Sequence, residues 1–433
     1  MSRPMDLAYG FCRASLAFLA CLIVVGCSES TNFRSPVDRG SLFEDIPDTG
    51  AIGDLTVGVV WPIGDGNFVE GARLAAHEIN ADKDSSQPQY KLVVVDENEF
   101  LATAGFERLG EGRYRNAPQR LANRLTEKFS SNPEVVAVVG HSDKYDTTLP
   151  AALSYQQSGI LFLAAASTHS QLDSPLTFQL SSPDSGLAEQ MASYVIQKGL
   201  ANILVLFSRD RTSLNFVNFL QKSIEKTTAA IHIHQQAVPN LQLSDGSWSD
   251  FDLTAIMTSL TKAVQEKNID SVLIVSDPDI TVRIIRRSKD FGVNVPFIVM
   301  PVMSNRGFVA DIGDEGVGVV MPVLVDESAS EFKKFAKRFV EYTNGNEPDS
   351  SASLGYDSIY LLDSAMTYAK SSKPLTVSLA LRYAMPAWSG VSGRFEFLDN
   401  GVNKHRKYFF KRLVRNEAGQ LTFVSEKSVQ EGG

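Results

Sequence analysis

The stretch that decides the fold is VVAVVGHSDKYDTTLPAALSYQQSGILFLAAASTHSQL, residues 135–172. Its first five residues are apolar and mostly β-branched, as expected of a strand that is buried on both faces. A turn at Gly140 is followed by a helical pattern over residues 147–158 and by a second apolar strand over residues 160–164. This order of strand, helix and strand predicts a βαβ unit with parallel strands.

The same rhythm extends outward from this stretch in both directions. Further strands are predicted at residues 55–61, 91–95, 202–207, 230–235, 271–275, 296–300 and 318–321, and further helices at residues 68–81, 118–129, 187–198, 213–227, 253–266, 281–291, 331–342 and 351–370. Such alternation predicts parallel sheets with helices on both faces. Because there are more units than one sheet comfortably holds, two doubly wound α/β lobes are expected.

The N-terminus reads as an export signal. Residues 14–25, ASLAFLACLIVV, are apolar but too few to span a bilayer, which takes about 20 residues. They end in Val-Val-Gly-Cys, which resembles the lipobox of bacterial lipoproteins and predicts that Cys27 carries a diacylglycerol and further acyl chains such as palmitate. The alternative is an ordinary cleaved signal peptide that happens to contain a cysteine.

Composition excludes several classes of protein. The 433 residues are 43% hydrophobic and 21% charged, which is typical of a globular chain. A net charge of -9 argues against a nucleic-acid partner, because phosphate groups are bound by clustered Lys and Arg. The three cysteines all lie within the first 27 residues, so the body can form neither a disulfide nor a thiolate metal site.

The order of segments resembles the type I periplasmic-binding-protein superfamily, closest to the branched-chain amino acid and amide receptors of ABC importers. Five stretches carry the resemblance: residues 57–81, 135–172, 178–184, 269–297 and 353–399. The resemblance implies two doubly wound parallel-sheet lobes joined by three crossovers. The expected divisions are a signal peptide (1–26), a polar tether (27–53), lobe 1 (54–179 and 323–405) and lobe 2 (180–322 and 406–427).

In the first lobe, the resemblance places ligand contacts in the turns that follow two strands. These are Ser142 and Asp143 after one strand, and Ser167 and Thr168 after the next; in the family both turns hold a carboxylate through hydroxyl and N–H groups. Trp61, at the end of the first strand, is a further candidate. Ser167 and Thr168 could instead merely cap the next helix.

In the second lobe, the candidates are Ser213 and Asp277. Asp277 follows a strand and is the best-placed carboxylate for a ligand ammonium, although capping of the following helix is an equal alternative. The family's usual Tyr-Gly near Ser213 and an acid near Met300 are missing here. These departures put a free amino acid in doubt and favour a small polar ligand such as an amide, a carboxylate or a modified amino acid.

Two functions follow. The first is a membrane-anchored, periplasm-facing or extracellular solute-binding protein, with an ABC permease or another membrane protein as its partner; Ser28 after the lipidated cysteine implies the outer membrane in a Gram-negative cell. The second is a ligandless or sensory lipoprotein that regulates a partner such as a cell-wall synthase. An enzyme ranks third, because no catalytic motif, cofactor site or metal site is predicted; His232 and His234 alone make a poor metal site.

Overall fold

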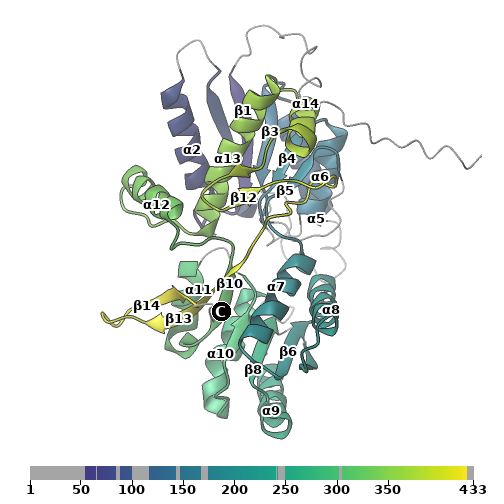
Figure 1. Ribbon diagram of the computed structural model, residues 1–433, viewed down its shortest axis with the longest axis vertical. Coiled ribbons are helices and arrows are strands. Elements are labelled where there is room, and N and C mark those ends of the chain that lie inside the picture. The colour runs from purple at the N-terminus through teal and green to yellow at the C-terminus, as the bar shows by residue number, and fades with distance from the viewer. Residues whose placement is uncertain are drawn as a thin grey trace, which may run out of the picture. The chain divides into compact units, whose positions relative to one another are not determined.

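The computed structural model describes residues 54–64, 66–83, 88–99, 117–142, 147–166, 174–239, 241, 249–301 and 305–426. Within these residues the chain forms two large sheets, each flanked by helices (Figure 1). The proposed signal peptide and tether, residues 1–53, lie outside the described part of the chain.

The first sheet is parallel throughout and follows the order β2-β1-β3-β4-β5. Its strands are β1 (Leu55–Trp61), β2 (Tyr90–Asp96), β3 (Val135–Gly140), β4 (Leu161–Ala164) and β5 (Thr177–Gln179). All seven residues of β1 are buried, because β1 lies between two neighbouring strands and has helices over both of its faces.

Helices cover the two faces of this sheet in pairs. One pair is α2 (Phe68–Asp82) and α13 (Ser350–Ala369); the other is α5 (Ala117–Ser130) and α6 (Thr148–Gln157). Val57 and Val59 belong to the apolar cluster that contains α2 and α13, whereas Val60 belongs to the cluster of α5 and α6. Alternate residues of β1 therefore serve opposite faces. Later elements of the chain are α12 (Ser330–Tyr342), α14 (Pro374–Leu379), η4 (Ala380–Ala384), β11 (Trp388–Ser389) and β12 (Arg394–Phe395).

The second sheet has the same kind of parallel strand arrangement, with two further strands at one end. Its order is β14-β13-β10-β9-β8-β6-β7. The strands are β6 (Asn202–Ser208), β7 (His232–Val238), β8 (Ser271–Val275), β9 (Phe297–Val299), β10 (Val320–Val323), β13 (Phe409–Arg415) and β14 (Leu421–Ser425). The run from β7 to β10 is parallel in the same order as the first sheet, so the predicted pair of parallel-sheet lobes is confirmed.

The helices of the second sheet are also divided between its faces. Leu204 and Leu206 of β6 belong to one apolar cluster, and Val205 to another. The helical segments are α7 (Asp184–Gln197), α8 (Arg211–Glu225), α9 (Asp250–Lys267), α10 (Pro278–Ser288), η2 (Lys289–Phe291), α11 (Asn305–Ile312) and η3 (Gly313–Gly316).

One feature of the second sheet differs from the sequence prediction. Strands β13 and β14 are antiparallel to each other, and β13 is antiparallel to β10. A tight turn joins them, in which the Asn416 N–H donates to the Gln420 carbonyl and Gly419 adopts a φ of 77°. In β13, FFKRLVR, charged residues interrupt the apolar ones, so the segment lacks the continuous apolar run by which the other strands were recognised.

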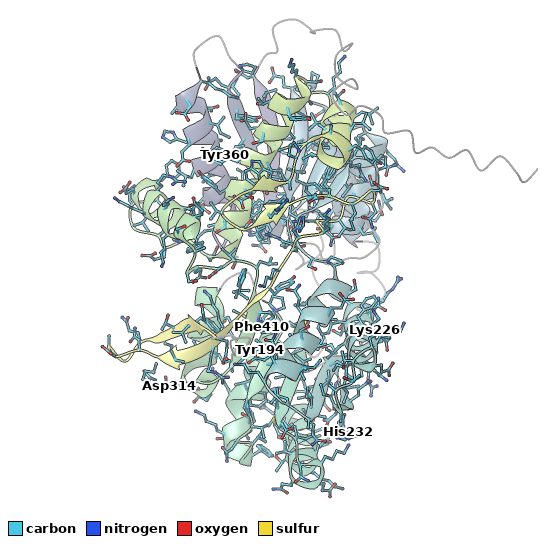
Figure 2. All side chains as sticks on the ribbon, viewed as in Figure 1. Tyr194, Lys226, His232, Asp314, Tyr360 and Phe410 are labelled. Atoms are coloured by element: carbon cyan, nitrogen blue, oxygen red, sulfur yellow. The ribbon has the colours of Figure 1, made fainter. Side chains whose placement is uncertain are left out.

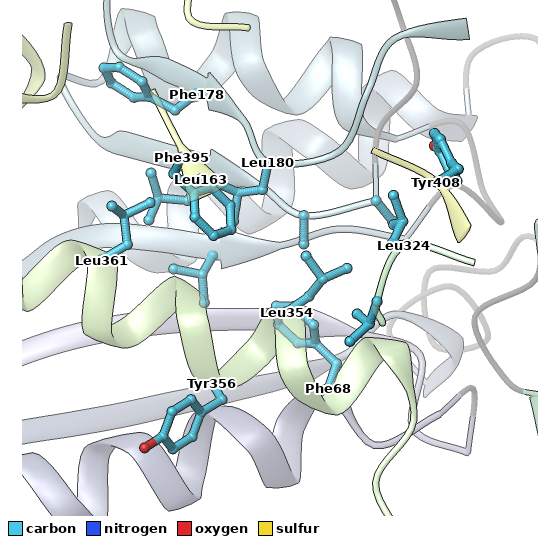
Figure 3. Close-up of a cluster of buried hydrophobic side chains, with 14 of the residues drawn as sticks. Phe68, Leu163, Phe178, Leu180, Leu324, Leu354, Tyr356, Leu361, Phe395 and Tyr408 are labelled. Carbon is cyan, nitrogen blue, oxygen red and sulfur yellow. The ribbon is translucent and has the colours of Figure 1, made fainter. Parts of the chain in front are cut away.

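The chain passes three times between elements of the two sheets, at residues 180–183, 324–329 and 404–408. Leu180, Leu324 and Tyr408 at these crossings are buried and belong to one apolar cluster (Figure 3). The crossings are therefore part of the packed interior at these positions.

Candidate functional site

The strand order of each sheet contains a switch point, the kind of position at which open α/β sheets hold ligands. In the first sheet the strand order reverses at β1, so that the helices after β1 and β3 lie on opposite faces. In the second sheet the same reversal falls between β6 and β8. At such switch points the connections diverge from the carboxyl ends of neighbouring strands and leave a crevice. The polar residues at these strand ends form the candidate site.

In the first sheet, the end of β3 is a constrained turn. A Cβ atom at Gly140 would lie 2.2 Å from the Val60 carbonyl oxygen, and the φ of Gly140 is 114°, so this position needs glycine. His141 follows with a φ of 55°, which is uncommon for a residue with a side chain. The side chains of His141 and of Ser142 next to it are both fully buried.

A buried carboxylate meets this turn. Glu97, the first residue after β2, has no exposed surface. Its Oε2 accepts hydrogen bonds from the Ser142 N–H at 3.3 Å and the Ser142 hydroxyl at 3.2 Å. Its Oε1 accepts from the Thr147 hydroxyl at 2.8 Å and lies 3.1 Å from Nδ1 of His141. Two donors at each oxygen match the hydrogen-bonding capacity of an ionised carboxylate.

These contacts set the charge of Glu97. Burial alone would raise its pKa, because a buried charge loses its hydration. The hydrogen bond and the charge of His141, followed by the hydrogen bonds from Thr147 and Ser142, outweigh burial and hold the pKa of Glu97 below its ordinary value of 4.5. Glu97 is therefore an anion at neutral pH.

The same contacts fix the orientation of His141. The Thr147 hydroxyl donates to Glu97, so its oxygen can accept from Nδ1 of His141 at 2.9 Å. Nε2 of His141 lies 3.0 Å from the Tyr155 hydroxyl, and the rings of Tyr155 and Phe162 meet the imidazole edge-on. Burial first, and then the charge of Glu97, raise the pKa of Tyr155 well above its ordinary value, so this phenol keeps its proton.

Three predicted ligand residues of the first lobe lie outside the described part of the chain: Asp143, Ser167 and Thr168. Ser142 is described and is bonded to Glu97. Trp61 is fully buried at the end of β1 and stacks on Phe68, with ring centroids 4.4 Å apart. Ligand contact by these residues remains a prediction.

In the second sheet, hydroxyl and carboxylate groups follow β6 and β8. The hydroxyls of Ser208 and Ser276 lie 2.6 Å apart. Asp210 caps α8, because its carboxylate accepts from the Ser213 N–H at 2.8 Å and from the Ser213 hydroxyl at 2.7 Å. The predicted ligand residue Ser213 therefore uses its hydroxyl within this cap.

Asp277 holds the N-cap position of α10, yet its side chain makes no capping hydrogen bond. The predicted alternative, a capping role for this side chain, is therefore wrong. Asp277 reaches solvent, and its pKa is raised, first because the protein around it displaces water and then because the charges of Asp210 and Asp279 are close. A cation beside Asp277 would relieve this cost.

Sequence reasoning missed Glu97, Thr147 and Tyr155. Glu97 carried one usable signal, since it lies two residues after the predicted strand 91–95, and the carboxyl ends of parallel strands meet at one edge of a sheet. Its partners lie 44 or more residues away in the chain, so their pairing depends on register between strands, which no local pattern reports.

Within the described residues, no group of three or more His, Cys, Asp or Glu side chains could hold a metal ion. His232 and His234 lie on β7, within the strand predicted at residues 230–235, and β7 is an edge of its sheet. None of the helices within the described residues combines the length and apolarity needed to cross a membrane.

The two sheets, their matching strand orders and the polar strand ends define a two-lobed α/β protein with its candidate site at the switch points. A model of the family described as periplasmic binding protein matches residues 115–418, and the chain belongs to that family. The family consists of solute-binding proteins, whose place is outside the cytoplasm. No curated protein sequence matches the chain.

Solved structures of low sequence identity share the fold. An ABC transporter substrate-binding protein from Desulfitobacterium hafniense, solved in complex with Leu, is 21% identical with a TM-score of 0.68; the match covers 86% of this chain and 100% of that chain. The branched-chain amino acid transporter substrate-binding protein LivJ from Streptococcus pneumoniae, in complex with isoleucine, is 17% identical with a TM-score of 0.65 and the same two coverages. A solute-binding protein from R. palustris, in complex with benzoate, is 16% identical with a TM-score of 0.61, covering 86% and 96%.

Proposed function

We propose that this protein is a lipid-anchored, extracytoplasmic solute-binding protein that captures a small polar ligand between its two lobes and delivers it to an ABC importer. Family membership supports a solute-binding role. The structures that share the fold include amino-acid and benzoate complexes of transporter proteins, which supports a ligand of similar size. Hydroxyl and carboxylate groups follow the strands at both switch points, which supports a polar ligand.

The proposal rests mainly on the position and charge of Asp277. This residue stands at the end of β8 with an exposed carboxylate that is not used to cap α10. Its raised pKa indicates that the folded protein holds this negative charge at a cost. A ligand ammonium or amide N–H would pair with it and remove that cost.

Binding to Asp277 can be tested by calorimetry with a panel of amino acids, amides and amines. Asp277→Asn should weaken binding of the best ligand about tenfold, which corresponds to ~1.4 kcal/mol. Asp279→Asn is the matched control, because it removes a carboxylate from the first turn of the same helix and should change binding much less. Equal effects of the two variants would contradict the role of Asp277, and no binding across the panel would contradict ligand capture.

Lipid anchoring through Cys27 is a separate part of the proposal. Replacement of Cys27 by Ala should move the protein from the membrane fraction to the soluble fraction and abolish incorporation of labelled palmitate. An ordinary signal peptide would instead give a soluble, unlabelled wild-type protein. The change Cys21→Ala is the control, since it removes a cysteine within the apolar segment and should leave labelling intact.

A second candidate function, regulation of a partner protein without a ligand, is favoured by one observation. The Ser142 N–H and hydroxyl groups, predicted to contact a ligand, both donate to Glu97. If the site serves no ligand, the wild-type protein should show no thermal stabilisation with any member of the panel. Loss of the gene should then alter cell-wall synthesis rather than solute uptake.

A further inference from the structure

The end of β3 and the start of α6 form a set of buried donors suited to an anion. Thr147 holds the N-cap position of α6, but its hydroxyl makes no capping bond and donates to Glu97 instead. The Ser142 N–H and hydroxyl groups and Nδ1 of His141 converge on the same carboxylate. The N-terminus of α6 also carries the positive end of the helix dipole, which favours negative charge.

The carboxylate that accepts from these donors belongs to the chain itself. Glu97 enters from the neighbouring strand β2, and neither Glu97 nor His141 nor Ser142 has exposed surface. A ligand carboxylate could bind here only by displacing Glu97 or by lying against it. Displacement would leave a buried charge unpaired, and contact would place two like charges together; either arrangement is costly.

We propose that Glu97 is a built-in occupant of an anion-binding subsite at the carboxyl end of β3, and that it selects for ligands with no carboxylate at that position, such as amides or amines. This inference rests on the proposed function, because it names the chemical class of the ligand of the same site. Its first part, that Glu97 occupies an anion subsite, can be tested without knowing the ligand.

The first experiment is chemical rescue of the full chain, extracted from membranes in detergent. Glu97→Ala leaves the donors of Ser142, Thr147 and His141 without their acceptor and opens space for a small carboxylate. Acetate, compared with chloride at equal ionic strength, should raise the Tm of E97A by at least ~2 °C and should leave the wild-type Tm unchanged.

Two further variants sharpen this test. Glu97→Gln fills the same volume without charge, so it should be less stable than the wild type and should not respond to acetate. Glu99→Ala removes an exposed carboxylate two residues away and should behave as the wild type does. The proposal is overturned if acetate stabilises wild type and E97A equally, or stabilises neither. If E97A folds poorly in chloride, its yield in acetate serves as the same readout.

The second experiment tests ligand class with matched probes that share one side chain: leucine, leucinamide and 3-methylbutylamine. The wild type should bind the amide or the amine at least tenfold more tightly than leucine, a difference of ~1.4 kcal/mol. Tighter binding of leucine would overturn the selectivity for ligands without a carboxylate while leaving the solute-binding function intact. If none of the three probes binds, the result counts against selectivity for amides or amines that carry the leucine side chain. The acetate rescue of E97A still decides separately whether Glu97 occupies an anion subsite.

Discussion

Asp357, in the middle of α13, is fully buried, and its carboxylate organises the loop before β12. It accepts hydrogen bonds from the Val391 N–H at 2.9 Å and from the N–H and hydroxyl of Ser392 at 2.6 and 2.5 Å. The guanidinium of Arg406 donates to the Ser392 carbonyl, which links the third crossing to α13. Burial raises the pKa of Asp357 to about 6, against the opposing effect of these hydrogen bonds and of Arg406.

Asp357 should therefore give a distinctive pH dependence. The folded protein holds this proton more tightly than the unfolded chain, whose pKa is near 3.8, so its contribution to stability is present below about pH 4 and is lost as the pH rises through about 6. That difference corresponds to ~3 kcal/mol. The free-energy penalty of Asp357→Asn, measured by urea unfolding, should shrink by up to this amount between about pH 4 and pH 7. The exposed Asp311→Asn control should show a flat penalty, and a flat profile for D357N would contradict the prediction.

The contribution of Glu97 to stability should depend on pH in the opposite direction. Its folded pKa is lowered, so its contribution to stability is present above its ordinary value of 4.5 and is lost as the pH falls through the folded pKa. Glu97→Gln should cost ~2–4 kcal/mol at neutral pH, because the amide cannot accept from all of the donors that face it. The same urea titrations at neutral and acidic pH should show this penalty decreasing toward low pH. A penalty that grows on acidification would mean that Glu97 is not the anion described above.

These two carboxylates show what the sequence can and cannot specify at the scale of the residue. Ser142 and Asp277 follow predicted strands, and their positions at strand ends could be read from the chain. The partners of Glu97 and Asp357 could not, because each pairing joins segments 34 or more residues apart. Whether a strand-end group is free for a ligand or bonded within the protein is decided by those distant partners.

At the scale of the element, apolar runs gave accurate boundaries where a strand is buried on both faces. Strands β1 and β8 begin and end at the predicted residues. Strands at or next to a sheet edge were less predictable: the edge strand β7 begins two residues later than expected and runs to Val238, and β13 and the edge strand β14 were not expected. An edge strand has fewer buried positions, so fewer of its residues are constrained to be apolar.

Helices α2 and α13 approach each other so closely that two glycines are required. A Cβ atom on Gly71 would lie 1.9 Å from the Ala352 carbonyl oxygen, and one on Gly355 would lie 2.0 Å from the Phe68 carbonyl oxygen. Neither oxygen can move without shifting a helix backbone. This contact brings Tyr356 of α13 to Glu78 of α2, where its hydroxyl donates to the carboxylate at 2.5 Å.

Substitution of either glycine by alanine should therefore be costly, although alanine is the better helix former. Gly71→Ala and Gly355→Ala should each lower the free energy of unfolding by ~1–3 kcal/mol through overpacking, measured by urea denaturation. Gly186→Ala in α7 is the matched control, since its Cβ would meet only the Ser182 hydroxyl, which can rotate away. A stabilising effect at Gly71 or Gly355 would show that the two helices are not in this close contact.

At the scale of the whole molecule, the three crossings mean that neither predicted lobe is one continuous stretch of chain. Residues 54–179 contain the first sheet, but α13, which covers one of its faces, begins only at Ser350, about 170 residues after the last strand of that sheet. Figure 3 shows Leu354 and Leu361 of α13 in one buried cluster with Phe68 of α2 and Leu163 of β4. The lobe division itself is a proposal that follows from this pattern of contacts.

A dissection of the chain would test that division. A fragment of residues 54–182 should fail to fold, because four large side chains of α13 are missing, Leu354, Ile359, Leu361 and Leu362, all at most 1% exposed in the intact protein. Burial of each contributes ~2 kcal/mol, and their sum of ~8 kcal/mol is comparable with the 5–15 kcal/mol that stabilises a whole domain.

Joining residue 182 to residue 324 by a short Gly-Ser linker, and ending the chain at 405, restores α13 to the first sheet. This joined chain should show helical circular dichroism and one cooperative thermal transition, whereas the shorter fragment should show neither. Cooperative folding of residues 54–182 alone would mean that the first sheet does not depend on α13, and failure of the joined chain would place the lobe boundary elsewhere.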